Sequence, residues 1–406
     1  GKGDVEIELD GDNELKSGTQ RAGLEKTSTG KLTLKDDNKE AGNLKATGGN
    51  NAAGIGGGFQ GNGENITITG GTVTATGGFS AAGIGGGREG KGENITITGG
   101  TVNATSNDGA GIGGGLLGSG ENIAITGGTV NATGTDGAGS GGGNGGVGKN
   151  ITITGGTVTA AGGFGNAGIG GGSSGSGENI TINDGKVTAT GAYGGAGIGG
   201  GLNGIGSKIT VSGAAHVTAT ATASRDPDWP HTDTGATIGN GSTRTPDGKS
   251  ADGKEIQADI NGLTTGWIHH IIYNPLLNWN DEPDTILKEW WEFALPKPIP
   301  DGESLDLHVE TLKGAPLPFN TRQQGSTLRV TTDNLSARLH GTRQALETLQ
   351  EQGVEQIEFV TTLKTTTLSV EDLLAEGGSW FALEHDGLGS RRLSAAQAES
   401  LKCWRH

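Results

Sequence analysis

The chain is poor in several features that mark common protein classes. It has one cysteine, Cys403, which excludes internal disulfides and a zinc site built from several cysteines. No apolar run approaches the roughly 20 residues that a membrane-spanning helix needs. The net charge is −16, and no basic stripe is present to neutralise a phosphate backbone. We therefore expect no membrane span in this fragment and no nucleic-acid partner.

Glycine, by contrast, is abundant and periodic. The chain holds 83 glycines, and many belong to the string Ala-Gly-Ile-Gly-Gly-Gly, which returns every 28 or 29 residues. A fixed period of this length predicts a solenoid, in which each repeat buries its apolar side chains by stacking on the next. The strings lie at Ala53–Gly58, Ala82–Gly87, Ala110–Gly115, Ala138–Gly143, Ala167–Gly172 and Ala196–Gly201, with Ser140 in place of isoleucine in the fourth.

A polar loop and a threonine-rich segment follow each string, and the first such segment is Asn65–Thr76. Alternation places Ile66 and Ile68 on the inner side, and Thr67 and Thr69 on the outer side. A glycine pair then breaks the strand before a second alternating run. With the string as a third segment, each repeat has the three short strands of one coil. The repeat therefore predicts a mainly β chain folded as a right-handed parallel β-helix. Its glycine content disfavours a solenoid built from α-helices.

Degenerate copies of the pattern extend over residues 5–245, which predicts about eight coils with irregular ends. We therefore expect residues 1–250 to form the β-helix. The change of composition after it predicts a smaller α+β region over residues 251–406, as one domain or two small subdomains. Because Gly1 lies close to the first repeat, we expect the chain to be an excised mature fragment.

One repeat position is an asparagine in five successive copies. The triplet Asn65-Ile66-Thr67 fits an N-glycosylation site, but an asparagine stacked on its neighbours has no room for a glycan. We expect instead that these side chains hydrogen-bond the backbone of adjacent coils at a turn. The column comprises Asn65, Asn94, Asn122, Asn150 and Asn179, and ends at Lys208.

Most aromatic residues of the repeats lie in the loops beside the glycine strings. Phe79, Phe164 and Tyr193 share one position, five residues before the central residue of their strings. Such rings either cover the corner of a coil or form a row of platforms for sugar rings, because an aromatic face packs well on a pyranose. We take these three as candidate ligand-binding residues.

We identify no catalytic residues. Polysaccharide-cleaving enzymes on this fold collect carboxylates on one face, with Arg, Lys or calcium, whereas the outward strand positions here are mostly threonine. Asp184 and Lys186 are isolated substitutions, and we expect no pair of acids at matching offsets in successive repeats. A phosphate-binding loop, a Ser/His/Asp order and a His-Glu-x-x-His motif are also missing.

Residues 251–406 contain six of the seven tryptophans and no repeat. We expect helices over Asp284–Phe293, Ser336–Gln352 and Ser394–Trp404, and a shorter one capped by Ser369. The strand-like runs are Glu255–Ile260, Trp267–Tyr273, Leu305–Glu310, Thr327–Thr332, Gln356–Thr362 and Ser379–Glu384.

Two adjacent pairs in this region are candidates for binding. On a helix, Trp290 and Trp291 would point to different faces, one toward the core, and we take Trp291 as a candidate ligand-binding residue. His269-His270 suggests a metal site, but adjacent residues of a strand point to opposite faces. We therefore expect no metal ion at the histidines.

An acidic segment offers one further possibility. Asp281, Glu282 and Asp284 fit a calcium site, and they also fit the N-terminus of a helix, which favours negative charge. Calcium is thus the one cofactor that the sequence leaves open.

The repeat also resembles a known family. Gly-Glu-Asn-Ile-Thr-Ile-Thr-Gly-Gly-Thr-Val-Thr-Ala-Thr-Gly-Gly, followed by Ala-Ala-Gly-Ile-Gly-Gly-Gly, is similar to repeats of large extracellular proteins of Firmicutes, especially gut clostridia. The segment Glu8–Leu15 resembles the start of those repeat regions. The resemblance covers residues 5–245 and implies a secreted or cell-surface protein of the carbohydrate-binding, adhesin-like kind. It implies nothing for residues 251–406 and assigns no binding residue.

The sequence thus favours an extracellular binding or adhesion module, whose β-helix is a rigid stalk or a platform for a polysaccharide or host cell-surface glycan. Three alternatives stay open: a polysaccharide lyase or glycoside hydrolase on the same fold, an ice-binding solenoid, and a purely structural spacer. The outward threonine ladders, which favour ice binding, are interrupted at Asn103, Ala124, Asn131, Asn183 and Lys186.

Overall fold

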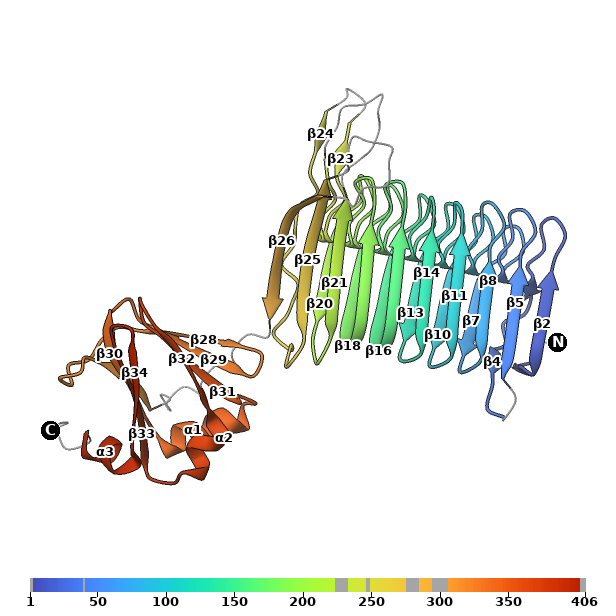
Figure 1. Ribbon diagram of the computed structural model, residues 1–406. Helices are drawn as coiled ribbons and strands as arrows, with labels where there is room; N and C mark the ends of the chain where they lie inside the picture. Colours follow the sequence, from blue (N-terminus) through green and yellow to red (C-terminus); the bar gives the residue numbers. More distant parts are fainter. Residues whose placement is uncertain are drawn as a thin grey trace. The chain divides into compact units, whose positions relative to one another are not determined.

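The computed structural model describes residues 3–38, 41–222, 233–245, 249–274, 285–293 and 306–401. It divides into two compact units, Gly1–Glu292 and Phe293–His406. The chain is mainly β, with 51% strand and 6% helix, and the first unit is a parallel β-solenoid of about 11 turns (Figure 1). The boundary expected at residue 250 lies too early, because later strands still belong to the solenoid.

One sixteen-stranded sheet carries the threonine-rich segments. Each coil contributes two strands, which merge into one in β16 (Gly148–Gly162) and β18 (Gly177–Gly191). The first strands of the other coils are β1 (Val5–Glu8), β4 (Leu32–Lys35), β7 (Gly63–Ile68), β10 (Gly92–Ile97), β13 (Gly120–Ile125) and β20 (Gly206–Val211). The second strands are β2 (Gly11–Lys16), β5 (Gly42–Thr47), β8 (Thr72–Thr76), β11 (Thr101–Ser106), β14 (Thr129–Gly134) and β21 (His216–Thr222).

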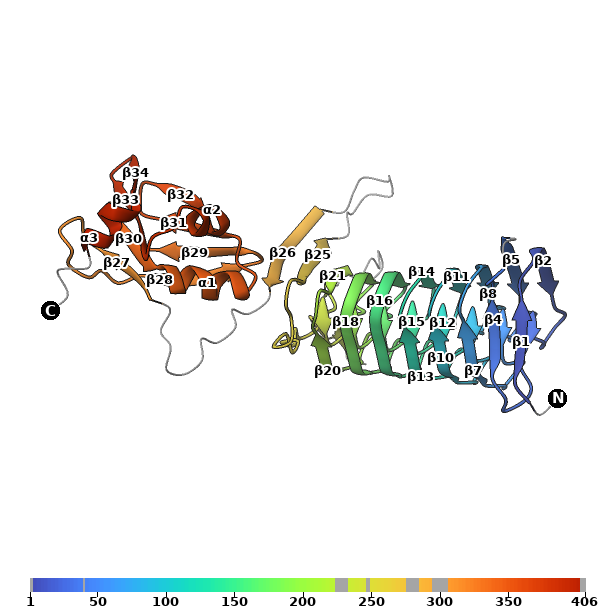
Figure 2. The same ribbon diagram turned by 90° about the horizontal axis from the view of Figure 1, so that it is seen from below.

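The glycine strings form a second parallel sheet of eight two-residue strands, one for each expected coil. Figure 2 shows β12 and β15 in this stack. The backbone explains the glycines: Gly113 has φ +135°, and a Cβ on it would lie 2.0 Å from the carbonyl oxygen of Gly141. The strands are β3 (Leu24–Glu25), β6 (Ile55–Gly56), β9 (Ile84–Gly85), β12 (Ile112–Gly113), β15 (Ser140–Gly141), β17 (Ile169–Gly170), β19 (Ile198–Gly199) and β22 (Ile238–Gly239).

The inner columns have the register that the period predicts. Ile95 pairs in parallel with Ile66 on one side and with Ile123 on the other. These side chains have no exposed surface, so each contributes on the order of 2 kcal/mol of hydrophobic stabilisation. Ile112 is likewise fully buried and Thr126 is exposed, which confirms the predicted alternation.

The long sheet continues beyond the expected end of the solenoid. Strand β25 (Trp267–Asn274) pairs in parallel with β21, with Trp267 opposite His216. Strand β26 (Thr285–Phe293) pairs with β25 and runs in the opposite direction (Figure 1). Strand β25 thus extends the parallel stack beyond the eight coils expected. A short hairpin, β23 (Thr243–Arg244) and β24 (Ser250–Ala251), precedes them.

Two predictions for this stretch are wrong. The helix predicted over Asp284–Phe293 is strand β26, because pairing with β25 places Trp290 and Trp291 on opposite faces of the sheet, where each stacks on a histidine. The strand predicted over Glu255–Ile260 is reduced to isolated bridges at Glu255 and Asp259.

Glu255 instead closes the free end of the glycine-string sheet. Its carboxylate accepts hydrogen bonds from the backbone N–H groups of Thr237 (2.6 Å) and Ile238 (3.1 Å). Burial raises the pKa of Glu255. Nearby, His270 is 2% exposed, and its Nδ1 lies 2.6 Å from the Thr237 hydroxyl. Burial is the main cause that lowers the pKa of His270 to about 4, so the ring is neutral in the folded solenoid near neutral pH.

The second unit is α+β and compact. Its core includes Leu339, Leu346, Ile357 and Phe359. One four-stranded sheet is β27 (Leu307–Glu310), β30 (Ser336–Thr342), β33 (Trp380–Asp386) and β34 (Gly389–Leu393). The other is β28 (Asn320–Gln324), β29 (Thr327–Thr331), β31 (Gln356–Val360) and β32 (Thr365–Ser369). The helices are α1 (Arg343–Glu351), α2 (Val370–Ala375) and α3 (Ala395–Ser400).

The helix predictions for this unit are confirmed in part. Over Ser336–Gln352 the first half is β30, and α1 begins only after Thr342, whose side chain accepts the first-turn N–H of Ala345. Ser369 caps α2 as predicted. The end of the helix predicted over Ser394–Trp404 lies outside the described residues.

Candidate functional site

The predicted binding residues lie in two places on the solenoid. Phe79, Phe164 and Tyr193 lie in the turns that precede the glycine strings. We call this row the loop edge (Phe79, Asp108, Asp136, Phe164 and Tyr193). Trp291 lies far along the chain, on strand β26. The structure therefore brings the first three into one row along the coils and leaves Trp291 in a separate group.

The loop edge contains one aromatic pair. The rings of Phe164 and Tyr193, on adjacent coils, stack with centroids 4.7 Å apart and planes 17° apart. This geometry confirms that the two residues share a register. Because the pair covers one face of each ring, it offers a ligand less aromatic surface than two separate platforms would. Phe79 and Phe164 remain 64% and 56% exposed.

Acids lie between these aromatics, and here the expectation of no matching acid pair is wrong. Asp108 and Asp136 each stand four residues before the central residue of their string. They lie on adjacent coils, where the N–H of Asp136 donates to the carbonyl of Asn107 (2.6 Å). Burial, together with the negative charge of Asp108, raises the pKa of Asp136. Asp108 accepts a hydrogen bond from Ser80 Oγ (3.2 Å). The pair can be found from the sequence by comparing how many residues separate each acid from the central residue of its string.

A second acidic column follows the glycine loops. Glu93 pairs in register with Glu64 and Glu121. Lys91 offsets part of this charge, with its Nζ 3.1 Å from Glu121. The ion pair indicates a structural role for the column.

The asparagine column forms a ladder, and only Asn65 makes the bond to the backbone that the sequence predicts. The side-chain amide of Asn94 donates to the side-chain oxygen of Asn65 (3.1 Å), and the next three asparagines repeat this bond at 3.1, 2.9 and 2.8 Å. Each residue has φ between +53° and +55°, which asparagine tolerates better than most residues. The amide of Asn65 donates to the carbonyl of Thr29 (3.0 Å). The first asparagine therefore bonds the backbone of the preceding coil, and the other four link coils through their side chains.

Trp291 belongs to a group that we call the terminal aromatic cluster (His216, Trp267, His269 and Trp291). His269 stacks on Trp291 with centroids 3.8 Å apart and planes 6° apart. Trp267 stacks on His216 at 5.0 Å and meets Trp291 edge-on at 4.9 Å. Glu289 Oε1 lies 2.5 Å from His269 Nε2 and so orients that imidazole. His216 and Trp291 are exposed, Trp291 by 42%.

This cluster lies at the end of two outward columns of the long sheet. The first runs through Thr72, Thr101, Thr129, Thr157, Lys186 and His216 to Trp267. The second runs through Thr74, Asn103, Asn131, Thr159, Thr188 and Thr218 to His269. The outer face therefore presents hydroxyls and amides in rows that lead to two indole rings, an arrangement suited to a polymer with hydroxyls and apolar ring faces.

The two histidines of β25 lie as their adjacency predicts. His269 contacts Trp291 on the outer face, whereas His270 is buried against Trp290. Among the residues that the structure describes, no group of three or more His, Cys, Asp or Glu side chains is placed to hold a metal ion. Asp281, Glu282 and Asp284, the calcium candidates, lie outside those residues.

Comparison with known protein families agrees with this architecture. A family model described as a beta helix repeat matches residues 40–59, 66–88, 95–116, 123–144, 151–173 and 180–202. The scaffold is a β-helix repeat. No curated protein and no solved structure matches the chain. The β-helix repeat thus accounts for the coils, and the loop edge and terminal aromatic cluster are features carried on it. Within the described ranges, no helix has the length and apolar character needed to cross a membrane.

Proposed function

We propose that the protein is an extracellular, cell-surface-associated module that binds polysaccharide or host-cell glycan, with the β-helix as a rigid platform. The terminal aromatic cluster is the observation that carries this proposal. Trp291 and His216 are exposed, and Trp267 and His269 continue rows of hydroxyl and amide side chains in register. Such a face matches a pyranose polymer, because sugar rings combine apolar faces with hydroxyl edges.

The mechanism is binding without chemistry. One sugar ring packs on Trp291, whose orientation is held by His269 and Glu289, and neighbouring rings hydrogen-bond the threonines. Each stacking contact contributes on the order of 1 kcal/mol. Affinity at one site is therefore weak, and tight attachment to a surface depends on several contacts along one polymer or several copies of the protein. The resemblance of the repeat to extracellular proteins supports the location.

The test is retention on insoluble and soluble polysaccharides. We expect Trp291→Ala to weaken retention by about fivefold, which is what the loss of one stacking contact gives. Leu117→Ala is the matched control, since Leu117 is an apolar side chain that is 61% exposed and lies outside the cluster. Equal retention of both variants would contradict the assignment of the cluster. The double variant Phe164→Ala/Tyr193→Ala tests the loop edge in the same way, and retention of no glycan by the wild type would favour a spacer.

Glycoside hydrolysis at the loop edge is a second candidate function. The observation that favours it is that the two acids have different surroundings. Burial raises the pKa of Asp136, which favours the protonated form that a general acid needs. The carboxylate of Asp108 instead accepts a hydrogen bond from the Ser80 hydroxyl. The retained polysaccharide is assayed for new reducing ends with wild type and Asp136→Asn. Release by the wild type that Asp136→Asn abolishes would establish hydrolysis, and no release by the wild type rejects it.

A further inference from the structure

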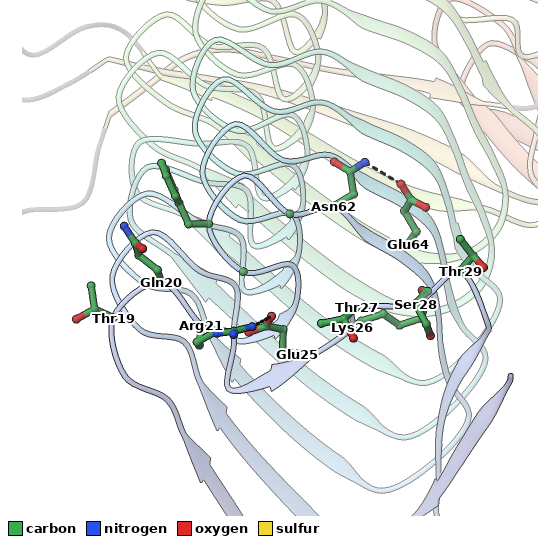
Figure 3. Close-up of a pocket in the computed structure, with 13 residues that line it drawn as sticks. Thr19, Gln20, Arg21, Glu25, Lys26, Thr27, Ser28, Thr29, Asn62 and Glu64 are labelled. Atoms are coloured by element: carbon green, nitrogen blue, oxygen red, sulfur yellow. Dashed lines mark hydrogen bonds and ion pairs between the residues drawn. The ribbon is translucent and has the colours of Figure 1, made fainter. Parts of the chain in front are cut away.

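The first coil of the solenoid contains a pocket. In the later coils a glycine loop occupies the corresponding position. The pocket has a volume of about 590 Å³, within the range of small-molecule sites. Residues 19–21 and 25–29 of the first coil line it, together with Phe59 and Asn62 of the second coil and Glu64, which lies on β7 of the third. Figure 3 shows Gln20 and Arg21 on one side of the opening and Ser28 and Thr29 on the other.

The pocket exists because one glycine loop is missing. From the third coil on, the last glycine of each string donates its N–H to the loop of the preceding coil: Gly87 donates to Gly61 (2.9 Å), and Gly115 donates to Gly90 (3.1 Å). The first coil has Lys26-Thr27-Ser28-Thr29 in place of that loop. Among the described residues, the N–H of Gly58 therefore has no acceptor, and it lines the pocket.

The groups around this N–H define the ligand. An oxygen acceptor must take the place of the missing carbonyl, because a half-buried amide without a partner is unfavourable. Phe59, which is 37% exposed, supplies an apolar wall beside it. Two bases and two acids line the pocket, and Arg21 pairs with Glu25 at 2.7 Å, while Asn62 donates to Glu64 at 2.8 Å. The charges balance in a protein of net charge −16, so an anionic ligand gains nothing here.

We infer that this pocket binds a neutral pyranose unit of an oligosaccharide, with a sugar oxygen on the Gly58 N–H and a ring face on Phe59. A second hollow of about 600 Å³ shares Thr29 with the pocket and lies over Thr67, Thr69, Thr96 and Thr98. A longer oligosaccharide continues from the pocket onto the outer threonine face. The inference takes its ligand class from the proposed function, but its site is at the opposite end of the solenoid from the terminal aromatic cluster.

The test uses neutral tetrasaccharides of glucose, mannose and xylose, with tetragalacturonate as the anionic comparison, and follows amide resonances of the whole chain. We expect a neutral tetrasaccharide to shift the Gly58 amide and to leave the Gly87 amide unchanged, since Gly87 is already bonded. Phe59→Ala should weaken this binding about fivefold, and Leu117→Ala, which removes an exposed apolar side chain outside the pocket, should not.

Each other result has a defined meaning. An unshifted Gly58 amide with all tetrasaccharides, or equal binding by wild type and Phe59→Ala, overturns the site. A stronger response to tetragalacturonate overturns the neutral ligand. If Trp291→Ala abolishes polysaccharide retention but leaves the Gly58 shift intact, both sites stand. If Trp291→Ala has no effect while the Gly58 shift persists, only the terminal cluster fails.

Discussion

Ser140 is a polar residue in the otherwise apolar central column of the glycine strings, and its replacement gives a quantitative test of the core. It pairs in register with Ile112 and Ile169 and is 1% exposed, and its hydroxyl has no hydrogen-bond partner among the residues that the structure describes. An unsatisfied buried hydroxyl costs about 1–3 kcal/mol. Burying an isoleucine side chain instead gains about 1.5–3 kcal/mol. Imperfect fit removes about 1–3 kcal/mol of this sum. We therefore expect Ser140→Ile to stabilise the solenoid by about 2 kcal/mol.

The assay is urea unfolding combined with hydrogen exchange at the amides of Gly139 and Gly141, because long repeat arrays do not always unfold in one step. Ser140→Ala is the matched control: it removes the hydroxyl without filling the column, so it should stabilise less than Ser140→Ile. The mirror variant Ile112→Ser, one coil away, should destabilise by about 2–4 kcal/mol. A loss of stability in Ser140→Ile alongside a gain in Ser140→Ala would show that the column has no room at this coil, and would refute the reasoning.

Two further changes test the backbone and the end of the solenoid. Gly113→Ala should destabilise by about 3 kcal/mol or more, because φ +135° is strained for alanine and its Cβ would meet Gly141 O at 2.0 Å. Gly18→Ala should change stability by less than about 0.5 kcal/mol, because its Cβ would meet no atom of the described residues within 4 Å. Equal effects of the two variants in thermal melts would contradict the glycine argument. Burial is the main cause that lowers the pKa of His270 from 6.5 to about 4. Between these two pH values the unfolded chain binds a proton that the folded chain excludes. The free energy of unfolding therefore decreases by about 3 kcal/mol as the pH falls from 6.5 to 4. Glu255, whose pKa is raised, acts in the opposite direction. The contribution of His270 is therefore isolated by comparing the stability of wild type and His270→Gln as a function of pH. Parallel stability curves for the two proteins would exclude a contribution of His270.

The repeat itself was predictable because its signals are local and reinforce one another. Ile66 and Ile95 had to stack, since the period fixes which residues meet and alternation fixes which side chains face inward. The same logic located the asparagine column, although not its bonds: two amides one coil apart can bond each other as well as the backbone, and only the geometry decides.

The two ends of the solenoid could not be predicted in the same way. The sequence around Trp290 has a proline and acids before it, like the start of a helix, and no repeat to oppose that reading. Pairing with β25 overrides the local preference, because it stacks Trp290 on His270 and Trp291 on His269. The terminal aromatic cluster joins residues from 216 to 291, so no local pattern indicates it. The acid pair Asp108 and Asp136 was within reach of the sequence, and was missed because only strand positions were compared.

Stacking coil upon coil has a consequence for the length scale of recognition. Each coil advances by one strand spacing, about 4.8 Å. The separation of the first-coil pocket from the terminal aromatic cluster is therefore adjustable only in whole steps. Duplication or deletion of one 28- or 29-residue repeat changes that separation by one step and leaves both ends chemically intact. The number of repeats thus sets the distance between the two proposed binding sites. Under the proposed function, a periodic polymer meets both sites only when its own repeat matches that distance.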